Sequence, residues 1–582
     1  MRKFTWISLL FFTLFLAGCG DSPERLWLNA PDWSRAQFIG DTATGDAPVF
    51  ALSPEGNVYF LLVANVNGRY HPQAVALDPQ GAFLWKQDFH AIPMARPDQP
   101  RAYWTPQGIH LFWISAEQLY HALLDPETGE MIAPATKVSG EQRVASYDVA
   151  INQQGDMEVW FSGPRIAPGL FYFPDGDLES TPIQVDELGL SPQLAFDADD
   201  VLHVLWAQHP MGNTTINILY LNKAGGDPQP AGAISVAQPK AGLSSLFIGP
   251  SLGMDADRIY VFWSIEVRTG LGAGTVEARY TTFPRGDPQN ASDSEQLFAP
   301  FDYHLNYQPW PTEAIHAGKR DPLTPPLRGS LTQFSALRTS LPETATMQRQ
   351  LVSYTMRNKE YQTSILFFEN GAPTSYQLLS FTAGDTRSPY LTLDRSNYLY
   401  AAWLERGVEG FRIFFASTAP QIRSRYNQLS KEDYGAFLGQ TLFGMLTGAI
   451  LLPFAMMWMI VPIVLFLVTF PLRRGSNELR SPGNLISLGL ALAGYWITKI
   501  SMLAGLADFI PFSPWIPIIP DWLGPLLQLG VPLIIFGLGL VIAWLVTYRR
   551  QNYSLILFLL VYLAVDATLT TAIYGPIFLG TN

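Results

Sequence analysis

Hydrophobic and polar residues alternate along residues 48 to 403 in a phrase that returns several times. Each copy holds a proline, a short apolar run, a polar turn and a second apolar run that usually ends in tryptophan, as in residues 192–197 followed by 201–206. Six copies are visible, and the residue that opens the turn stands at positions 53, 105, 152, 197, 255 and 394. The first five of these markers lie 45 to 58 residues apart, a spacing typical of propeller blades.

A repeat of this length holds three or four short strands, and one such sheet cannot bury both of its faces alone. Stacking the sheets around an axis buries them, which predicts an all-β propeller of six or seven blades, with seven favoured. A pair of β-sandwiches is the alternative, but sandwich strands recur at roughly 8 to 12 residues without a longer period. We expect a seventh blade from the β-rich runs 350–356 and 363–368, preceded by an insertion at about 301–330.

The C-terminal part of the chain, residues 436–582, is predominantly apolar and follows a polar linker at 419–435. Four stretches in it reach the roughly 20 residues needed to cross a bilayer, namely 442–472, 485–507, 526–547 and 553–578. Arginines follow the first and third stretches, whereas the loop 508–521 contains neither lysine nor arginine. The positive-inside rule then predicts an all-α domain of four transmembrane helices with an extracytoplasmic C-terminus.

Prolines interrupt the first of these stretches, at Pro453 and Pro462, and raise the alternative of two spans there. Dividing the stretch would place Arg473 and Arg474 outside the cytoplasm and break the charge pattern. One span is therefore expected.

The N-terminus has the features of a secretory signal. Two basic residues precede an apolar run over 4–16, and the run closes with Leu16-Ala-Gly-Cys19. This closing sequence resembles the lipobox of bacterial lipoproteins, which implies removal of residues 1–18 as a signal peptide and lipidation of Cys19. Cys19 is the only cysteine of the chain, so no disulfide partner competes for it. We therefore expect the propeller, residues 19–418, on the extracytoplasmic face of a bacterial cell membrane.

The blade phrase resembles the repeat of sialidase-like (BNR-type) propellers over roughly residues 32 to 418. The resemblance implies the propeller fold and, as an alternative function, a carbohydrate-active hydrolase. The Asp-box of true sialidases, Ser-x-Asp-x-Gly-x-Thr-Trp, is absent from the sequence. The arginine triad and the tyrosine–glutamate pair of that family cannot be identified either, so sialidase activity is not expected.

Charge and motif content argue against several other functions. The formal net charge is −12, and residues 19–435 alone carry −16, which disfavours nucleic acids and anionic glycans as partners. The eight histidines form no His-Glu-x-x-His motif, and the sequence has no Cys-x-x-Cys pair and no phosphate-binding glycine loop. We predict no catalytic residue, metal site or cofactor, and an enzyme is not favoured.

Histidines occupy a matched place in two copies of the phrase, three residues before a tryptophan, at His110 and His203. Tyr260 and Tyr400 fill the same place in other copies. A structural aromatic role is therefore expected for this position rather than a shared site, and the repeated tryptophans are expected to pack in the core.

Polar residues recur four positions before the turn marker, where the innermost strand of each blade begins. Because innermost strands line the central channel of a propeller, these residues should surround one mouth of it. The predicted ligand-binding residues are Arg101, Asp148, Gln193, Ser251 and Tyr390. Residues two positions before the marker are mostly small, which predicts a narrow throat. A solvated strand end without a ligand is the alternative.

Two ionisable residues lie inside the apolar stretches, Lys499 in the second and Asp566 in the fourth. Counted from the same side, both should lie about 21 to 22 Å deep. A charge at that depth is costly unless it is paired, so we expect the two to form an ion pair that clamps the helices, with an ion pathway as the alternative.

The sequence as a whole predicts a membrane-anchored bacterial surface lipoprotein whose propeller binds an extracellular ligand or protein partner. Two alternatives remain open. One is the sialidase-like hydrolase, and the other is an extracytoplasmic subunit of a membrane export or signalling assembly. Besides the unknown ligand or protein, the expected partner is the lipid bilayer.

Overall fold

A computed structural model describes most of the chain. The described residues are 32–210, 212–223, 232–242, 244–270, 273–297, 330–338, 349–357, 361–380, 385–407 and 410–428, with short strands at 25–26 and 308–309. In the C-terminal region they are 452–469, 481–502, 510–512, 522–549 and 554–579, with a few single residues between 431 and 448. The chain divides into one compact unit over Pro23–Gln428 and another that contains Leu429–Asn582.

The described strands of the first unit form seven antiparallel sheets, five with four strands and two with five. The four-stranded sheets are β3–β6 (Ala51–Leu52, Val58–Val66, Arg69–Leu77, Phe83–Asp88), β7–β10 (Asp98–Thr105, Gly108–Ser115, Gln118–Leu124, Met131–Lys137), β11–β14 (Ser146–Ile151, Met157–Ser162, Leu170–Tyr172, Ile183–Asp186), β15–β18 (Gly189–Phe196, Leu202–Gln208, Asn217–Lys223, Ile234–Ala237) and β19–β22 (Ser245–Met254, Arg258–Val267, Val276–Pro284, Glu295–Leu297).

The five-stranded sheets lie later in the chain. One contains β24–β27 (Ser330–Ala336, Arg349–Arg357, Tyr361–Glu369, Ala372–Leu378) with β23 (Gln308–Pro309) added at its outer edge. The other contains β28–β30 (Thr386–Leu393, Leu399–Arg406, Phe411–Ser417), extended by β2 (Ala36–Thr42) and β1 (Arg25–Leu26). A sheet is therefore present over 349–378, where the sequence predicted a further blade. The rest of the expected insertion at 301–330 lies outside the described residues, apart from β23 and the start of β24.

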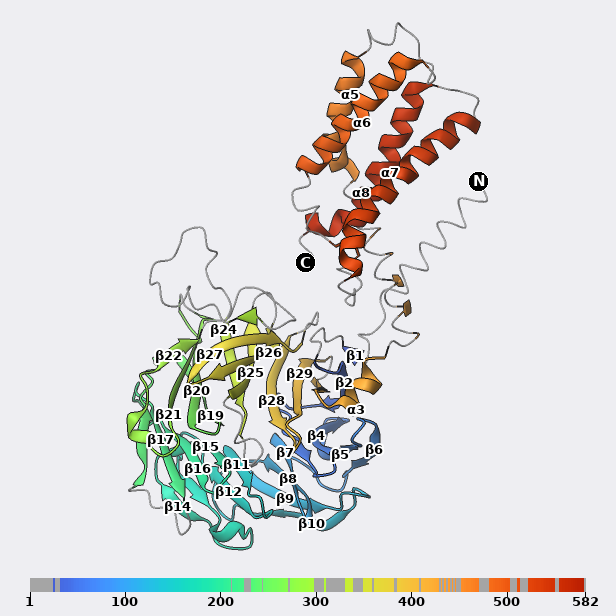
Figure 1. Ribbon diagram of the computed structural model, residues 1–582. Coiled ribbons are helices and arrows are strands. Elements are labelled where there is room, and N and C mark those ends of the chain that lie inside the picture. Colours follow the sequence, from blue (N-terminus) through green and yellow to red (C-terminus); the bar gives the residue numbers. More distant parts are fainter. Residues whose placement is uncertain are drawn as a thin grey trace. The chain divides into compact units, whose positions relative to one another are not determined.

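The sheets follow one another around a ring in chain order, from blue to yellow in Figure 1. Their innermost strands are neighbours, with β7 between β3 and β11, and with β15, β19, β24 and β28 continuing the series. Six sheets use strands that are consecutive in the chain, and the last sheet joins both ends of the unit because β2 pairs with β30. This arrangement is a β-propeller, as the repeat predicted.

The polar turn of the phrase closes the first hairpin of a blade. In Asp197 the Oδ1 atom accepts hydrogen bonds from the backbone N–H groups of Asp199 and Val201, each at 2.9 Å, and Oδ2 lies 3.1 Å from His203 Nε2. The same bonds recur elsewhere, with Tyr260 donating to Asp255 at 2.8 Å and Tyr400 donating to Asp394 at 3.0 Å. His203 therefore has a structural role, as expected from its slot in the repeat.

The repeated tryptophans are at most 1% exposed and lie between neighbouring sheets: Trp113, Trp160, Trp206, Trp263 and Trp403. Trp113, for example, packs in one cluster with Tyr59 and Leu61 of the preceding sheet. Large aromatic rings bury more apolar area than other side chains, so each one contributes to holding two blades together. The prediction of a core role is confirmed.

Part of the expected linker belongs to the propeller unit. Residues Pro420–Tyr426 form the short helix α3, and Ile422 and Tyr426 of this helix are buried against the sheet of β3–β6. The Tyr426 hydroxyl donates a hydrogen bond of 2.7 Å to the carbonyl oxygen of Gly81. The propeller unit also contains two 3-10 turns, Pro174–Gly176 and Pro288–Asn290.

The second unit contains the helices α5 (Leu452–Val468), α6 (Pro482–Met502), α7 (Leu523–Arg549) and α8 (Leu555–Leu579). By length and composition, two segments could cross a membrane, Leu523–Tyr548 of α7 and Leu555–Tyr574 of α8. The expectation of four spans is therefore supported for two of the described helices only. The helix α5 has 17 residues, fewer than the roughly 20 needed to cross a bilayer, and the helix α6 contains the polar residues Asn484 and Lys499. Both Pro453 and Pro462 lie within α5, so the first apolar stretch is not divided there.

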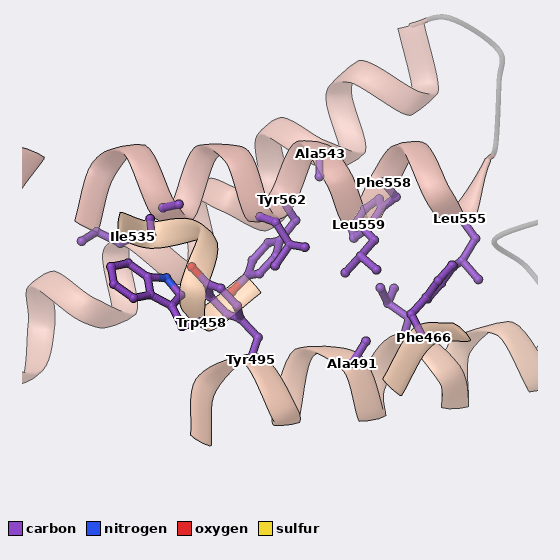
Figure 2. Close-up of a cluster of buried hydrophobic side chains, with 14 of the residues drawn as sticks. Trp458, Phe466, Ala491, Tyr495, Ile535, Ala543, Leu555, Phe558, Leu559 and Tyr562 are labelled. Atoms are coloured by element: carbon purple, nitrogen blue, oxygen red, sulfur yellow. The ribbon is translucent and has the colours of Figure 1, made fainter. Parts of the chain in front are cut away.

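The four helices share a buried core. Figure 2 shows Trp458 and Phe466 of α5, Tyr495 of α6 and Tyr562 of α8 among the side chains that meet in it. Large apolar side chains also cover the outside of the unit, such as Leu529 and Leu533 of α7, which are 74% and 67% exposed. Contiguous exposed apolar surface of this kind is what a helix presents to lipid.

Substitution of Gly155 can measure how tightly neighbouring blades pack. It has a φ of +91°, and a Cβ atom there would lie 2.5 Å from Cδ of Pro106 in the preceding sheet. Gly68 has a similar φ of +78° but no neighbour within 4 Å. Backbone strain should cost both glycine-to-alanine variants about 1 kcal/mol, and the clash should cost Gly155→Ala about 1–3 kcal/mol more. Thermal or urea unfolding of the two variants measures this difference, and equal losses would contradict the packing described.

Candidate functional site

A cavity of about 330 Å³ opens where the innermost strands begin, and we call it the mouth cavity. All five residues that the sequence predicted for a ligand site line it: Arg101 of β7, Asp148 of β11, Gln193 of β15, Ser251 of β19 and Tyr390 of β28. The structure thus brings together residues that are up to 289 positions apart in the sequence. Whether they bind a ligand stays a prediction.

Matched β-bulges turn these side chains toward the channel. The register of β7, β15, β19 and β28 shifts just before the site residue, and the residue two positions before it has a positive φ. These left-handed residues are Gln99, Ser191, Gly249 and Ser388, and a proline follows each one. Proline has no N–H group to lose at a point where the ladder is broken, which explains its place in the repeated phrase.

Asp148 is the centre of the charge network in the mouth cavity. Its side chain is 3% exposed, and Oδ1 accepts a hydrogen bond of 2.8 Å from Nη1 of Arg101. Oδ2 accepts one from Nη1 of Arg338 and another, at 2.7 Å, from the backbone N–H of Leu194. A buried carboxylate is costly unless it is compensated, and two guanidinium groups with one peptide N–H provide that compensation here.

Arg338 was missed by sequence reasoning. It follows β24, and its guanidinium donates to Asp148, to Oε1 of Gln193 and, at 3.0 Å, to the carbonyl oxygen of Leu194. The copy of the phrase in β24 and β25 lacks both the proline and the tryptophan, so this strand had no marker. Only the topology of the ring identifies Arg338 as a channel residue.

Burial and charge set the protonation of the surrounding groups. Burial disfavours the charged form of Arg101, but Tyr103 and Asp148 outweigh it and hold the pKa of Arg101 above its ordinary value. Burial raises the pKa of Tyr103 and of Tyr390, although Arg101 and Arg338 respectively oppose the shift. At neutral pH the mouth cavity therefore presents cationic guanidinium groups and neutral phenols, which can both donate and accept hydrogen bonds.

A further carboxyl group of the mouth cavity, that of Asp46, is in contact with the carboxyl group of Asp98. Asp46 lines the mouth cavity, and its Oδ2 atom accepts a 2.8 Å hydrogen bond from the backbone N–H of Gln99. Burial raises the pKa of Asp98 to about 7, helped by the charge of Asp46 and by a hydrogen bond between the two side chains. Two carboxylates in contact cannot both be ionised cheaply, so the pair retains one proton below that pH.

The carboxylate of Asp148 is fully engaged by its neighbours. Both oxygens of Asp148 are engaged by fixed donors, which leaves it poorly placed to accept a proton or attack a substrate. Among the described residues, no group of three His, Cys, Asp or Glu side chains is arranged to hold a metal ion. Cys19, the predicted lipidation site, lies outside the described residues.

In the second unit the structure places Lys499 and Asp566 in contact. Nζ of Lys499 lies 2.7 Å from Oδ2 of Asp566, and both residues are at most 1% exposed. The same oxygen accepts a hydrogen bond of 2.5 Å from the Tyr495 hydroxyl, and the ammonium group lies 4.6 Å from the centroid of the Trp496 ring. The pair that the sequence predicted thereby joins α6 to α8.

Asp98 generates a pH prediction. The pKa of Asp98 is about 7 in the folded chain, against about 3.9 for an aspartate in an unfolded chain. Its contribution to stability is therefore full below about pH 3.9 and is lost as the pH rises through about 7. Asp98→Asn keeps a neutral side chain and should flatten the fall in unfolding temperature between about pH 4 and 7.

The control for that measurement is Asp125→Asn. Asp125 lies on an exposed turn where hydrogen bonding, first from the Thr128 N–H, lowers its pKa, so it does not titrate in that window. Its substitution should leave the slope unchanged. Identical slopes for wild type and Asp98→Asn would show that the Asp46–Asp98 pair does not hold the proton.

The Lys499–Asp566 pair generates a second prediction. Lys499→Met or Asp566→Leu alone leaves one buried charge without its partner and should cost about 3–5 kcal/mol, while the double substitution should recover much of the loss. The amount of folded protein in the membrane fraction measures this. Thr568→Val, on the exposed side of α8, serves as the control. A double variant no better than the worse single one would contradict the pairing.

Comparisons with known proteins concern the fold alone. No family model matches the sequence, and no curated protein matches it either. Polysaccharide lyase Uly1 is 8% identical with a TM-score of 0.43, over 65% of this chain and 91% of the lyase. The propeller domain of the Trilobed protease from Pyrococcus furiosus is 9% identical with a TM-score of 0.36, over 68% of this chain and 100% of that domain. The endo-arabinase from Bacteroides thetaiotaomicron is 12% identical with a TM-score of 0.28, over 48% of this chain and 94% of the arabinase.

Proposed function

We propose that this chain is a membrane-anchored bacterial surface lipoprotein whose propeller binds a small, neutral, hydroxyl-rich ligand such as a short saccharide in the mouth cavity. The observation that carries the proposal is the network of Arg101, Asp148 and Arg338 at the cavity wall. It fixes two guanidinium groups beside the open cavity. Because these groups are already held in place, a ligand that bonds to them costs little conformational entropy.

The size and lining of the mouth cavity support this class of ligand. About 330 Å³ lies at the lower end of the range for small-molecule sites, enough for one or two sugar rings. The charges on its wall balance, with Asp46 and Asp148 against Arg101 and Arg338, so a strongly charged ligand gains little there. Hydroxyl and amide groups complete the wall and can bond to sugar hydroxyls: Gln193, Ser251, Gln333, Ser335, Ser388 and Tyr390.

The proposed anchoring rests on the two ends of the chain. The lipobox-like sequence before Cys19 supports lipidation after removal of residues 1–18. The apolar helices α7 and α8 support spanning, and we propose that α5 and α6 cross with them as a four-helix domain whose arginine-containing loops are cytoplasmic. The propeller and the C-terminus are then extracytoplasmic.

A hydrolase remains the second candidate, favoured by one observation. Sequence reasoning found only Asp148 to accompany Arg101, and the structure adds Asp46, which lines the mouth cavity and contacts Asp98. A carboxyl group that retains its proton up to about pH 7 suits a general acid. Asp98 is not among the residues that line the mouth cavity, however, so binding is the function that the cavity supports better.

Titration of the full chain with a panel of neutral saccharides tests the proposal. The panel consists of maltose, cellobiose, lactose and maltotriose, and the protein is held in a detergent without a sugar headgroup. Gln193→Leu removes a polar group from the mouth cavity at similar volume and should weaken binding about tenfold. Gln87→Leu, on the outer strand β6, should leave binding unchanged. Binding that is indifferent to Gln193→Leu would exclude the mouth cavity as the site.

Mass spectrometry of the mature protein tests the anchor. We expect a chain that begins at Cys19 and carries the mass of attached lipid, and Cys19→Ser should abolish both the cleavage and the added mass. The helical domain would still retain the Cys19→Ser protein in the membrane, because a single acyl chain contributes little beside spanning helices. An unmodified Cys19 or an intact Met1 in the wild-type protein would contradict lipidation.

A further inference from the structure

A second cavity, of about 490 Å³, lies at the opposite ends of the innermost strands, and we call it the turn-side cavity. The turns at 53–56, 152–155 and 394–396 surround it. Along β7 the order is clear, because Arg101 lines only the mouth cavity, Tyr103 lines both cavities and Trp104 lines only the turn-side cavity. The two cavities therefore occupy the two ends of one channel.

Four residues line both cavities and form the partition between them: Tyr103, Arg338, Tyr390 and Thr392. Two of the partition residues, Tyr103 and Thr392, stand where the sequence predicted a narrow throat. The partition is held from the mouth side, since Arg338 donates to Asp148 and Gln193 there. A ligand in either cavity meets the same partition.

We propose that the turn-side cavity is a second binding site for a neutral saccharide, coupled to the mouth cavity through Arg338. It adds a site to the proposed function and does not require the mouth cavity to be occupied. Aromatic side chains, balanced charges and a preformed rim in the turn-side cavity favour such a ligand.

Aromatic side chains supply flat apolar platforms in the turn-side cavity. Trp104 is half-buried and packs against the core cluster that contains Ala51 and Ala102, while it also lines the cavity. Tyr398 does the same against the cluster that contains Phe50 and Tyr400. A ring that the core holds in place can receive the C–H face of a sugar ring at little entropic cost.

Hydrogen-bonding groups complete the site, and its charges cancel. The hydroxyl groups of Tyr103, Tyr390 and Thr392 lie at the partition and can donate or accept. Glu55 and Asp394 balance Arg338 and Arg395 in the lining. Asp394 is also engaged already, by the backbone N–H groups of Ser396 and Tyr398 and by the Tyr400 hydroxyl. A neutral hydroxyl-rich ligand fits this chemistry better than an ion.

The rim of the turn-side cavity is formed before any ligand arrives. The turn at Gln153 is tied to the next sheet, since its backbone N–H donates to Asp200 at 3.1 Å and its side-chain Nε2 donates to the carbonyl oxygen of Ala198 at 2.9 Å. Gly155 of the same turn meets Pro106 of the preceding sheet. A preformed rim lowers the ordering cost of binding.

The saccharide panel described above, titrated calorimetrically into the full chain, tests this inference with four variants and one control. Trp104→Ala removes a platform that belongs to the turn-side cavity alone, and Trp104→Phe keeps a ring there. Gln193→Leu acts on the mouth cavity directly, and it acts on the turn-side cavity only through the hydrogen bond that Gln193 accepts from Arg338. Phe83→Ala, an exposed aromatic of β6 outside both cavities, is the control, and the unfolding temperature of each variant checks its fold.

We expect at least one saccharide to bind at two sites per chain. Trp104→Ala should weaken the turn-side site about tenfold and leave the mouth site. Gln193→Leu should weaken the mouth site about tenfold and the turn-side site by less, because it also removes an acceptor of Arg338. Trp104→Phe should retain both sites. Arg338→Met should weaken both sites, because its side chain lines both cavities. Unchanged affinity at either site in Arg338→Met would overturn the coupling.

The remaining outcomes separate this inference from the proposed function. A single site that responds to Gln193→Leu but not to Trp104→Ala would overturn the second site and leave the mouth cavity in place. A single site that responds more strongly to Trp104→Ala than to Gln193→Leu would support the turn-side cavity and overturn the mouth cavity as the binding site. No binding of any saccharide would overturn both.

Discussion

Every blade of this propeller faces the same constraint, which is that a four-stranded sheet has two apolar faces and cannot cover either by itself. Closing the sheets into a ring covers all of them at once, and the closure depends on β2 pairing with β30, residues that lie more than 360 positions apart. The buried cluster that joins Phe50 and Phe60 to Tyr400 and Phe415 lies at this junction. Loss of the junction would expose the faces of the first and last sheets, so the stability of the ring is shared around it.

The ring then creates the channel, and the bulges of the innermost strands decide what the channel contains. A positive φ followed by proline breaks the ladder at matched positions in four strands and turns one side chain of each toward the axis. Residues held in the left-handed region are strained, and such strain is tolerated where it positions a functional group. Asp148 shows the consequence, because its carboxylate can be buried only where Arg101 and Arg338 arrive from two other strands of the ring.

The second unit forms its buried core from helices instead of sheets. Its core is mostly apolar and buries a few polar side chains, among them Asp566, which accepts hydrogen bonds from Lys499 and Tyr495. Large apolar side chains also lie on its outer surface, so these polar contacts help to specify which helices are neighbours. The pair joins α6 to α8 and explains how an ionisable residue is kept in each of two apolar helices.

The sequence alone determined much of this protein, because period and charge are local signals. The spacing of the phrase predicted the propeller, the register within it identified Arg101, Asp148, Gln193, Ser251 and Tyr390 as channel residues, and equal depth suggested the Lys499–Asp566 pair. Only the tertiary structure revealed Arg338, because the strand that precedes it, β24, and its partner β25 lack the proline and tryptophan of the phrase. It also decided that α3 packs on the propeller, that Asp46 meets Asp98, and that the throat divides two cavities. Each of these depends on which segments the closed ring brings side by side, and no periodicity along the chain encodes that.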